Sequence, residues 1–370
     1  MQKIAHFCQV DVEQVVMVRD MPSIYQVPML LEKQGLIPLL KNILALDSVT
    51  ISDAHVKKGS KTWAQWRSLT GSEETRFYDT VSIALVGKYT ELHDSYLSVI
   101  KSLEHSAMRC RRVLKISWID SEHLEQKTLK DNDGLFYTAW SALSSAQGVL
   151  VPGGFGVRGT EGMIAAAKHA REKKKPYLGI CLGMQIAVIE YARNVCGMEN
   201  ATSDEFRDGA KDELITFMPE IDKTTMGATM RLGLRPTLFQ EGSEWSRLRA
   251  LYAGKTEILE RHRHRYEVNP KYIQQIEQGG LSFIGKDDAG VRMEVIEIKD
   301  HPWYVGVQFH PEYLSRVLDP SRPYLGFVAA SAGVLSEITR DYQNGNGGMS
   351  AEGLTNGVEG LSLNGSGGAF

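Results

Sequence analysis

Residues 177–185 read YLGICLGMQ, an apolar run that passes directly into an amphipathic stretch, with a cysteine at the junction. The run predicts a buried strand, and residues 182–195 predict a helix. Cys181 lies between Gly179 and Gly183, the G-x-nucleophile-x-G arrangement of a strained strand-to-helix turn, and glycines at both flanks are what so sharp a turn requires. A lone cysteine at a strand end is more often structural. Because of the two glycines and the helix N-terminus that follows, we predict a nucleophile here.

Short apolar runs alternate with helical patterns through the middle of the chain. The predicted strands are 82–87, 113–120, 148–154 and 175–181, and the predicted helices are 95–108, 161–175 and 182–195. This alternation predicts an α/β fold with a central, mostly parallel sheet flanked by helices. Residues 281–298 and 303–309 predict antiparallel strands that extend the sheet edge, and 323–339 predict a closing helix.

The two ends of the chain differ from this α/β region. Residues 1–46 hold a short apolar run and a helix-like stretch, too little to close a core of their own. Residues 47–80 are polar with two tryptophans at helical spacing, which predicts a linker with a helix lying on a surface. The main domain is predicted at 81–340. Residues 341–370 are rich in Gly, Ser and Asn, which predicts a disordered tail.

The composition of the 370 residues limits the possible partners. The net charge of -3 leaves no overall basic field, so we predict neither nucleic acid nor a membrane as partner, and a small neutral or zwitterionic substrate instead. Four scattered cysteines suit a reducing, cytoplasmic compartment better than a disulfide framework or a zinc site. No run approaches 18 consecutive apolar residues, which agrees with the absence of a membrane partner.

A possible general base lies far along the chain, in VGVQFHPEY (305–313), where His310 and Glu312 directly follow an apolar run. A histidine can take the thiol proton, and a carboxylate behind the ring can set its tautomer and stabilise the imidazolium. We therefore predict a triad of Cys181, His310 and Glu312. The sequence does not show that these residues meet, and an exposed His-Pro-Glu turn remains the alternative.

PGGFGVRG (152–159) fits the G-x-G-x-x-G pattern of a dinucleotide site. Such a site requires an acidic residue at the end of the next strand, but that strand ends in Cys181. We therefore favour an oxyanion loop, in which the N–H groups of Gly154 and Leu182 bind the tetrahedral intermediate.

RHRHRYEVN (261–269) alternates histidine and arginine. Metal ligation is possible, but alternation is more typical of the two faces of a strand, so no metal site is predicted. An arginine here could bind a substrate α-carboxylate, and Arg265 is the preferred residue.

Together with MENATSDEF (198–206), these motifs resemble the class I glutamine amidotransferase domain of the CTP synthase family over about residues 81–340. KIAHFCQV and DMPSIYQVPMLLEKQG resemble the closing part of that family's synthetase (amidoligase) domain, which implies that 1–46 are its C-terminal remnant. The resemblance implies the class I glutamine amidotransferase fold. It also implies that Cys181 forms a γ-glutamyl thioester, with His310 moving the proton and Glu312 orienting it.

Further residues are assigned only through this resemblance. Glu205 would bind the substrate α-amino group. The implied glutamine-binding residues are Gly154, Leu182, Gly183, Met184, Gln185, Glu205 and Arg265. The implied nucleotide-binding remnant is Lys3 for the pyrimidine nucleotide and Arg19, Asp20 and Met21 for the adenine nucleotide.

For the full enzyme the resemblance implies a cytoplasmic homo-oligomer, a tetramer, that uses ATP and Mg²⁺ to aminate UTP to CTP with ammonia from L-glutamine, activated by GTP. The glutaminase domain itself would need no cofactor. No phosphate-binding glycine loop precedes Lys3, so the chain is expected to be either a fragment or a truncated product. In both cases it is expected to hydrolyse glutamine poorly or not at all when alone. A regulatory or interaction fragment, and a thiol hydrolase for another amide, remain alternatives.

Overall fold

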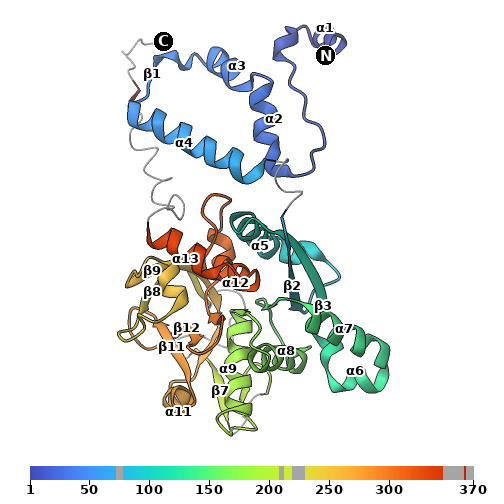
Figure 1. Ribbon diagram of the computed structural model, residues 1–370, viewed down its shortest axis with the longest axis vertical. Coiled ribbons are helices and arrows are strands. Elements are labelled where there is room, and N and C mark those ends of the chain that lie inside the picture. Colours follow the sequence, from blue (N-terminus) through green and yellow to red (C-terminus); the bar gives the residue numbers. More distant parts are fainter. Residues whose placement is uncertain (72–77, 208–211, 219–229, 345–361, 364–370) are drawn as a thin grey trace. The chain divides into compact units, whose positions relative to one another are not determined.

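The computed structural model describes all residues except 72–77, 208–211, 219–229, 345–361 and 364–370 (Figure 1). The chain divides into two compact units. One comprises residues 1–78 with 349–370, and the other comprises residues 79–348. Within the described residues, no helix is long and apolar enough to span a bilayer.

The first unit is mainly helical. Its elements are α1 (Gln2–Cys8), η1 (Val12–Gln14), η2 (Ile24–Gln26), α2 (Val27–Lys33), α3 (Leu36–Ile43), η3 (Leu46–Ser48), β1 (Val49–Thr50), α4 (Asp53–Thr70) and β14 (Ser362–Leu363), which pairs antiparallel with β1. The helix-like stretch predicted in 1–46 is two helices, because Gly35 adopts a left-handed conformation with φ 77° between α2 and α3.

Helix α4 occupies most of the region predicted as a linker. Trp66 donates its indole N–H to the carbonyl of Tyr25 at 3.0 Å, and Trp63 donates to Glu32 of α2 at 2.8 Å. These contacts hold α4 against the same unit that contains residues 1–46, so the unit boundary follows α4 at residue 78. The proposed division at residue 46 stays a prediction.

The second unit is built on a nine-stranded sheet with the order β3-β2-β4-β5-β13-β12-β11-β8-β9. Its strands are β2 (Thr80–Gly87), β3 (Val113–Asp120), β4 (Gly148–Val151), β5 (Tyr177–Ile180), β8 (Arg231–Phe239), β9 (Glu257–His264), β11 (Leu281–Lys286), β12 (Met293–Ile298) and β13 (Tyr304–Val307). The first five in the sheet order are parallel to one another, and the last four continue as antiparallel strands. A separate small sheet has the order β10 (Tyr266–Val268), β7 (Glu213–Phe217) and β6 (Thr202–Ser203).

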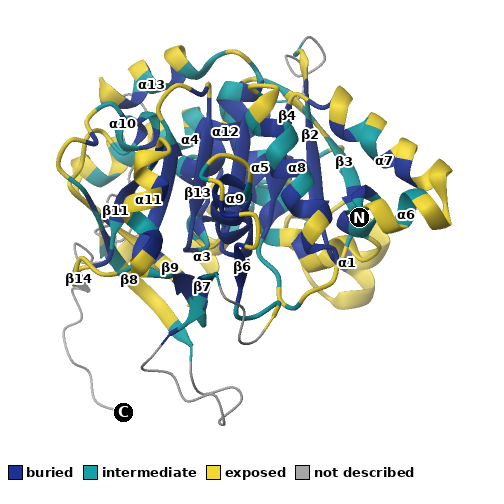
Figure 2. Ribbon diagram, turned by 90° about the horizontal axis from the view of Figure 1, so that it is seen from below, coloured by how far each residue is buried: buried dark blue, intermediate teal, exposed yellow. Residues whose placement is uncertain are grey.

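Helices cover both faces of the large sheet. They are α5 (Leu97–Arg109), α6 (Gln126–Asp131), α7 (Asp133–Ser145), α8 (Thr160–Glu172), α9 (Leu182–Asn194), α10 (Arg247–Leu251), α11 (Ile273–Gln278), α12 (Arg322–Ser331) and α13 (Leu335–Gln343), with short 3-10 turns η5 (His93–Tyr96), η6 (Ser121–Leu124), η7 (Pro270–Tyr272) and η8 (Pro311–Leu314). Along β2, Ala84 and Val86 pack with residues of α7, α8 and α9, whereas Ile83 and Leu85 pack with residues of α5 and α12. The central strands and α9 are buried (Figure 2), which explains their nearly continuous apolar sequences.

The predicted α/β fold is confirmed, including the four early strands, the helices among them and the hairpin of β11 and β12. The prediction for 303–309 is wrong in part, because β13 pairs antiparallel with β12 but parallel with β5 and so lies inside the sheet rather than at its edge. The predicted helix at 323–339 is also wrong in part. It is two helices, because Gly333 adopts φ 72° between α12 and α13. The tail predicted at 341–370 falls mostly outside the described residues, although α13 continues to Gln343.

Candidate active site

Cys181 occupies the turn between β5 and α9, and its backbone has φ 52° and ψ -102°. A positive φ is rare for a residue with a side chain and costs on the order of 1–3 kcal/mol, so the surrounding structure must enforce it. The Cys181 N–H donates to the carbonyl of Val307 at 2.7 Å, which fixes the turn to the end of β13.

The two glycines of the turn are required by close packing. A Cβ on Gly179 would lie 2.5 Å from the backbone of Gly183, and a Cβ on Gly183 would lie 2.0 Å from the carbonyl oxygen of Val151. Only hydrogen fits at these approaches. The turn therefore holds the first turn of α9 against β4 and β5, and both glycines are required, as predicted from the G-x-C-x-G pattern.

The sulfur of Cys181 lies near two polar groups that the sequence did not indicate. The carbonyl oxygen of Arg263 is 3.9 Å from Sγ, and the side-chain amide of Gln308 donates toward Sγ at 3.6 Å. Gln185 donates to the amide oxygen of Gln308 at 3.1 Å and to the carbonyl of Tyr266 at the same distance. Gln185 is thus buried behind the thiol, where it orients the amide that faces the sulfur.

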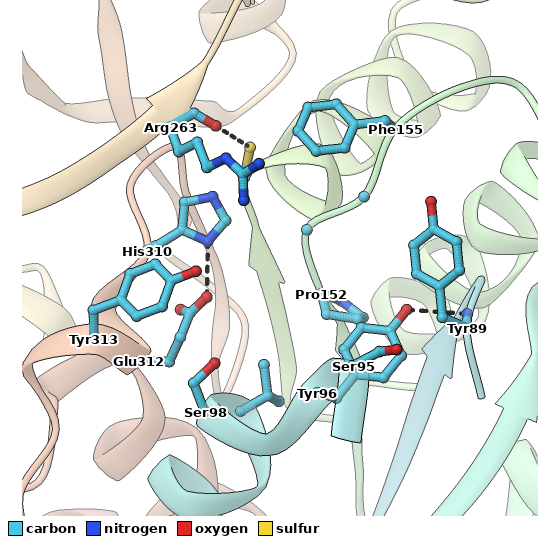
Figure 3. Close-up of a pocket in the computed structure, with 14 residues that line it drawn as sticks. Tyr89, Ser95, Tyr96, Ser98, Pro152, Phe155, Arg263, His310, Glu312 and Tyr313 are labelled. Carbon is cyan, nitrogen blue, oxygen red and sulfur yellow. Dashed lines mark hydrogen bonds and ion pairs between the residues drawn. The ribbon is translucent and has the colours of Figure 1, made fainter. Parts of the chain in front are cut away.

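His310 is joined to Glu312 by a hydrogen bond of 2.7 Å between Nδ1 and Oε1 (Figure 3). A carboxylate accepts, so Nδ1 carries the proton and Nε2 is left for the thiol. Burial alone would lower the pKa of His310, but the charge of Glu312 and the hydrogen bonding and charge of Cys181 raise that pKa well above its ordinary value. A protonated imidazole is the partner that a cysteine thiolate needs.

These groups surround a pocket of about 340 Å³ (Figure 3). Its lining residues are Tyr89, Ser95, Tyr96, Ser98, Val99, Pro152, Gly153, Gly154, Phe155, Cys181, Arg263, His310, Glu312 and Tyr313. The pocket therefore contains the three predicted triad residues and the predicted oxyanion glycine. Four of the lining residues each follow a parallel strand of the sheet: Tyr89, Gly154, Cys181 and His310. Because the carboxyl ends of parallel strands lie at the same edge of a sheet, these residues meet at that edge.

The glycine-rich loop after β4 lies directly on this site. A Cβ on Gly153 would meet the His310 ring at 2.9 Å, and a Cβ on Gly154 would lie 3.4 Å from the side chain of Leu182. The loop thus passes between the base and the first residue of α9. This placement agrees with an oxyanion loop.

The other predicted glutamine-binding residues lie around the pocket rather than in its wall. Leu182, Gly183 and Met184 form the buried first turn of α9. Glu205 accepts a hydrogen bond from the N–H of Gly156 at 2.7 Å. Burial raises the pKa of Glu205, although this hydrogen bond and the positive charges of Lys88 and Arg265 act to lower it. Nε of Arg265 is buried, and among the described residues it has no hydrogen-bond partner.

The alternation predicted for RHRHRYEVN is confirmed, since Arg261 and Arg263 of β9 are exposed and His262 and His264 are buried. The two histidines and Glu294 place one ligand atom each within 4.8 Å of one another. Arg231 lies 3.3 Å from Glu294 and supplies a positive charge to this cluster. Burial lowers the pKa of His262 to about 2 and that of His264 to about 3.

The predicted nucleotide-binding residues all belong to the first unit. Lys3 is an exposed residue of α1, and Arg19, Asp20 and Met21 lie between η1 and η2, with Met21 half-buried. Their assignment stays a prediction.

Glu312 offers a test of the His310 charge. The folded pKa of His310 lies above its ordinary value of 6.5, so the stability gained from the imidazolium is complete below about pH 6.5 and is lost as pH rises through the raised value. We expect the difference in unfolding free energy between the wild type and Glu312→Gln to be largest below pH 6.5 and to shrink in alkaline solution, by up to about 1.4 kcal/mol per pH unit.

Urea unfolding between pH 6 and 10 measures this difference. The same pair of chains in a Cys181→Ala background removes the thiol's own titration from the comparison. If the difference in unfolding free energy does not depend on pH in either background, Glu312 does not stabilise the protonated form of His310.

Comparison with known proteins adds two family matches. Residues 91–330 match the model described as glutamine amidotransferase class-I, and residues 1–46 match the model described as CTP synthase N-terminus.

Whole-sequence relatives give the same family name. The CTP synthase of Neurospora crassa is 62% identical over 92% of this chain and 58% of that protein, and CTP synthase 1 of Saccharomyces cerevisiae is 52% identical over 91% of this chain and 58% of that protein. The chain thus spans less than three fifths of the length of these relatives. Among solved structures, the glutaminase domain of Trypanosoma brucei CTPS with bound acivicin matches with a TM-score of 0.63 and 39% identity, covering 69% of this chain and 94% of that one.

Proposed function

Because this chain belongs to the CTP synthase family of class I glutamine amidotransferases, we propose that it carries the glutaminase half-reaction, hydrolysis of L-glutamine to glutamate and ammonia at Cys181. One observation carries this proposal. The cysteine sits at a strained turn in the same pocket as a hydrogen-bonded His310–Glu312 pair.

The proposed chemistry begins with the thiolate of Cys181 attacking the side-chain carboxamide carbon, while His310 holds the thiol proton. When the tetrahedral intermediate collapses, the C–N bond breaks and His310 donates its proton to the departing nitrogen. Ammonia is released, and the γ-glutamyl group remains bound to Cys181 as a thioester. Water, deprotonated by His310, then attacks the thioester, and the products are glutamate and the free thiol. Glu312 keeps the Nδ1 proton in place throughout.

We assign the oxyanion to the N–H groups of Gly154 and Leu182. Leu182 is the first residue of α9, so its N–H is not used within the helix and lies at the positive end of the helix dipole. Gly154 packs against the Leu182 side chain, which keeps the two backbone segments together. These two donors would stabilise charge that develops only in the transition state.

The substrate's charged end is assigned to residues beyond the pocket wall, with Glu205 binding the α-amino group and Arg265 the α-carboxylate. Nε of Arg265 has no hydrogen-bond partner among the residues that the structure describes, and the charge of Arg265 acts on Glu205; both observations support an opposite-charge pair suited to a zwitterion. Gly183, Met184 and Gln185 complete the proposed glutamine site through the first turn of α9.

For the complete enzyme we propose that this ammonia serves the ATP- and Mg²⁺-dependent amination of UTP to CTP, with GTP as activator, in a cytoplasmic homo-tetramer. Lys3, Arg19, Asp20 and Met21 would contribute to the nucleotide sites. The exposed cations Lys3 and Arg19 are of the type that binds phosphate, which supports this assignment.

Acivicin, the compound bound to the trypanosomal glutaminase domain, provides the first test. We expect it to modify one site per chain, at Cys181, as measured by intact mass and peptide mapping, with no modification of Cys181→Ala. Modification of exposed Cys8 with equal ease would contradict a specific site. The second test is glutamate release with and without GTP. We expect slow turnover without GTP, and no release under either condition would leave the chain as an interaction fragment.

A further inference from the structure

Lys88 follows β2 and is the least exposed lysine among the described residues, with 3% of its surface accessible. Its ammonium group donates to the carbonyl oxygens of Phe155, at 3.1 Å, and of Gly156. Both acceptors belong to the glycine-rich loop that borders the pocket. A buried cation with backbone partners on one loop indicates a specific role, because burying it is costly.

Glu205 binds the same loop at the opposite pole of the same peptide. Its Oε1 accepts from the N–H of Gly156 at 2.7 Å, while the carbonyl of the Phe155–Gly156 peptide accepts from Lys88. In a trans peptide the C=O and N–H groups point in opposite directions. Rotating this peptide would turn its carbonyl toward the carboxylate of Glu205 and its N–H toward the ammonium of Lys88. Both charge-assisted hydrogen bonds would then be lost and replaced by repulsive contacts.

Close packing does not restrict Gly156, the second residue of this peptide. Gly156 has φ 77°, and within the part of the chain that the structure describes no heavy atom outside residues 155–157 lies within 4 Å of the position where its Cβ would be. Glycine also has little intrinsic preference for one backbone conformation. The loop orientation at this point therefore depends on the two charged side chains.

The same lysine reaches the proposed oxyanion glycine. A Cβ on Gly154 would lie 3.6 Å from Cδ of Lys88 and 3.4 Å from Cδ2 of Leu182. The aliphatic part of the Lys88 side chain therefore packs against Gly154. Gly153, one residue earlier, adjoins His310. Lys88 thus contacts the loop at 154, 155 and 156, immediately after the segment that lies on the catalytic base.

We propose that Lys88 is a positioning residue, which together with Glu205 clamps the Phe155–Gly156 peptide and so keeps the Gly154 N–H directed at the reacting carbonyl oxygen. This inference rests on the proposed glutaminase function. Lys88 does not touch the thiol or His310, and it acts through the loop. Burial lowers the pKa of Lys88 to about 8, although the negative charge of Glu205 acts to raise it. This lowered pKa agrees with a lysine held in a desolvated site.

The test compares three variants of the full chain. Lys88→Met removes the ammonium and keeps a flexible apolar stem, and Lys88→Arg restores a cation. Lys175→Met is the matched control, because Lys175 also donates to two carbonyls, those of Ser144 and Ala146, but precedes β5 and so lies at the opposite edge of the sheet from Cys181.

Backbone hydrogen exchange is the readout that does not depend on activity. We expect exchange across 153–157 to quicken at least about 10-fold in Lys88→Met, equivalent to about 1.4 kcal/mol. In Lys88→Arg most of the protection returns, and Lys175→Met leaves this segment unchanged. Unchanged exchange in Lys88→Met, in a chain that melts near the wild-type temperature, would overturn the clamp.

Kinetics separate a positioning role from a general structural one. For Lys88→Met we expect kcat for glutamine to fall about 10²-fold, as for the loss of one oxyanion donor, with KM changed less than about 3-fold. Alkylation of Cys181 by iodoacetamide, which needs no oxyanion hole, should stay within about 2-fold of the wild type because the thiol is untouched. Equal losses in hydrolysis and alkylation would overturn the proposal. If the wild type hydrolyses no glutamine, the proposed function fails, and hydrogen exchange still decides whether the clamp exists.

Discussion

Replacing Cys181 with alanine is expected to lower kcat for glutamine hydrolysis by at least about 10⁴-fold, since removing the nucleophile of a triad removes the covalent route altogether. Glutamate release, followed by a coupled dehydrogenase assay, measures the loss. Residual hydrolysis within about 10-fold of the wild type would contradict Cys181 as the nucleophile, because no other described cysteine lines the pocket.

A second substitution at this position separates chemistry from folding. Alanine retains a Cβ at φ 52°, whereas glycine adopts that conformation freely. We therefore expect Cys181→Gly to be as inactive as Cys181→Ala but more stable, by about 1 kcal/mol in urea unfolding. If the two variants are equally stable, the turn is not strained at Cys181.

Replacing Gly183 with alanine is expected to reduce the free energy of unfolding by at least about 4 kcal/mol, a large effect for one methyl group. The new Cβ would lie 2.0 Å from the carbonyl oxygen of Val151 and 3.2 Å from its Cβ, and backbone in the centre of a sheet cannot move aside. Either α9 or β4 must shift, which disrupts the most buried layer of the domain. Denaturant unfolding followed by circular dichroism measures the change.

Gly134→Ala in α7 is the matched control for Gly183→Ala. The nearest atom to its new Cβ is the side-chain oxygen of Asn132 at 3.5 Å, an ordinary contact, and the backbone there is helical. Alanine in a helix favours folding, so we expect a gain of up to about 1 kcal/mol. A Gly183→Ala chain as stable as Gly134→Ala would show that β4 and α9 are not in backbone contact.

Much of the fold could be predicted from local patterns. Strands buried on both faces are continuous apolar runs, and β2 and β4 are of this kind. The position of β13 could not be predicted in the same way, because whether a strand pairs parallel or antiparallel depends on its neighbours in space. Strand β8 has no clear apolar pattern in the sequence, because only Thr237 and Phe239 of its residues are buried and Pro236 interrupts the run.

The candidate site was predictable where chemistry and local geometry coincide in one segment. Cys181 has its glycines beside it, and His310 and Glu312 are two residues apart. The contribution of Gln308 to the sulfur environment depends on the pairing of β5 with β13, which no local pattern contains. Lys88 and Tyr89 have no catalytic motif around them in the sequence. Their position at the end of a parallel strand beside β4 was the signal that could have indicated the site.

The parallel pairing of β5 and β13 has a consequence for how the protein is made. Cys181 leaves the ribosome long before Gln308, 127 residues later, and before the base that follows it. A growing chain therefore carries an ordinary thiol, and the nucleophile is formed only when β13 inserts between β5 and β12. Strand insertion over such a sequence separation is slow compared with helix formation. Catalytic competence should thus appear late and abruptly in biogenesis, with the last strand of the sheet.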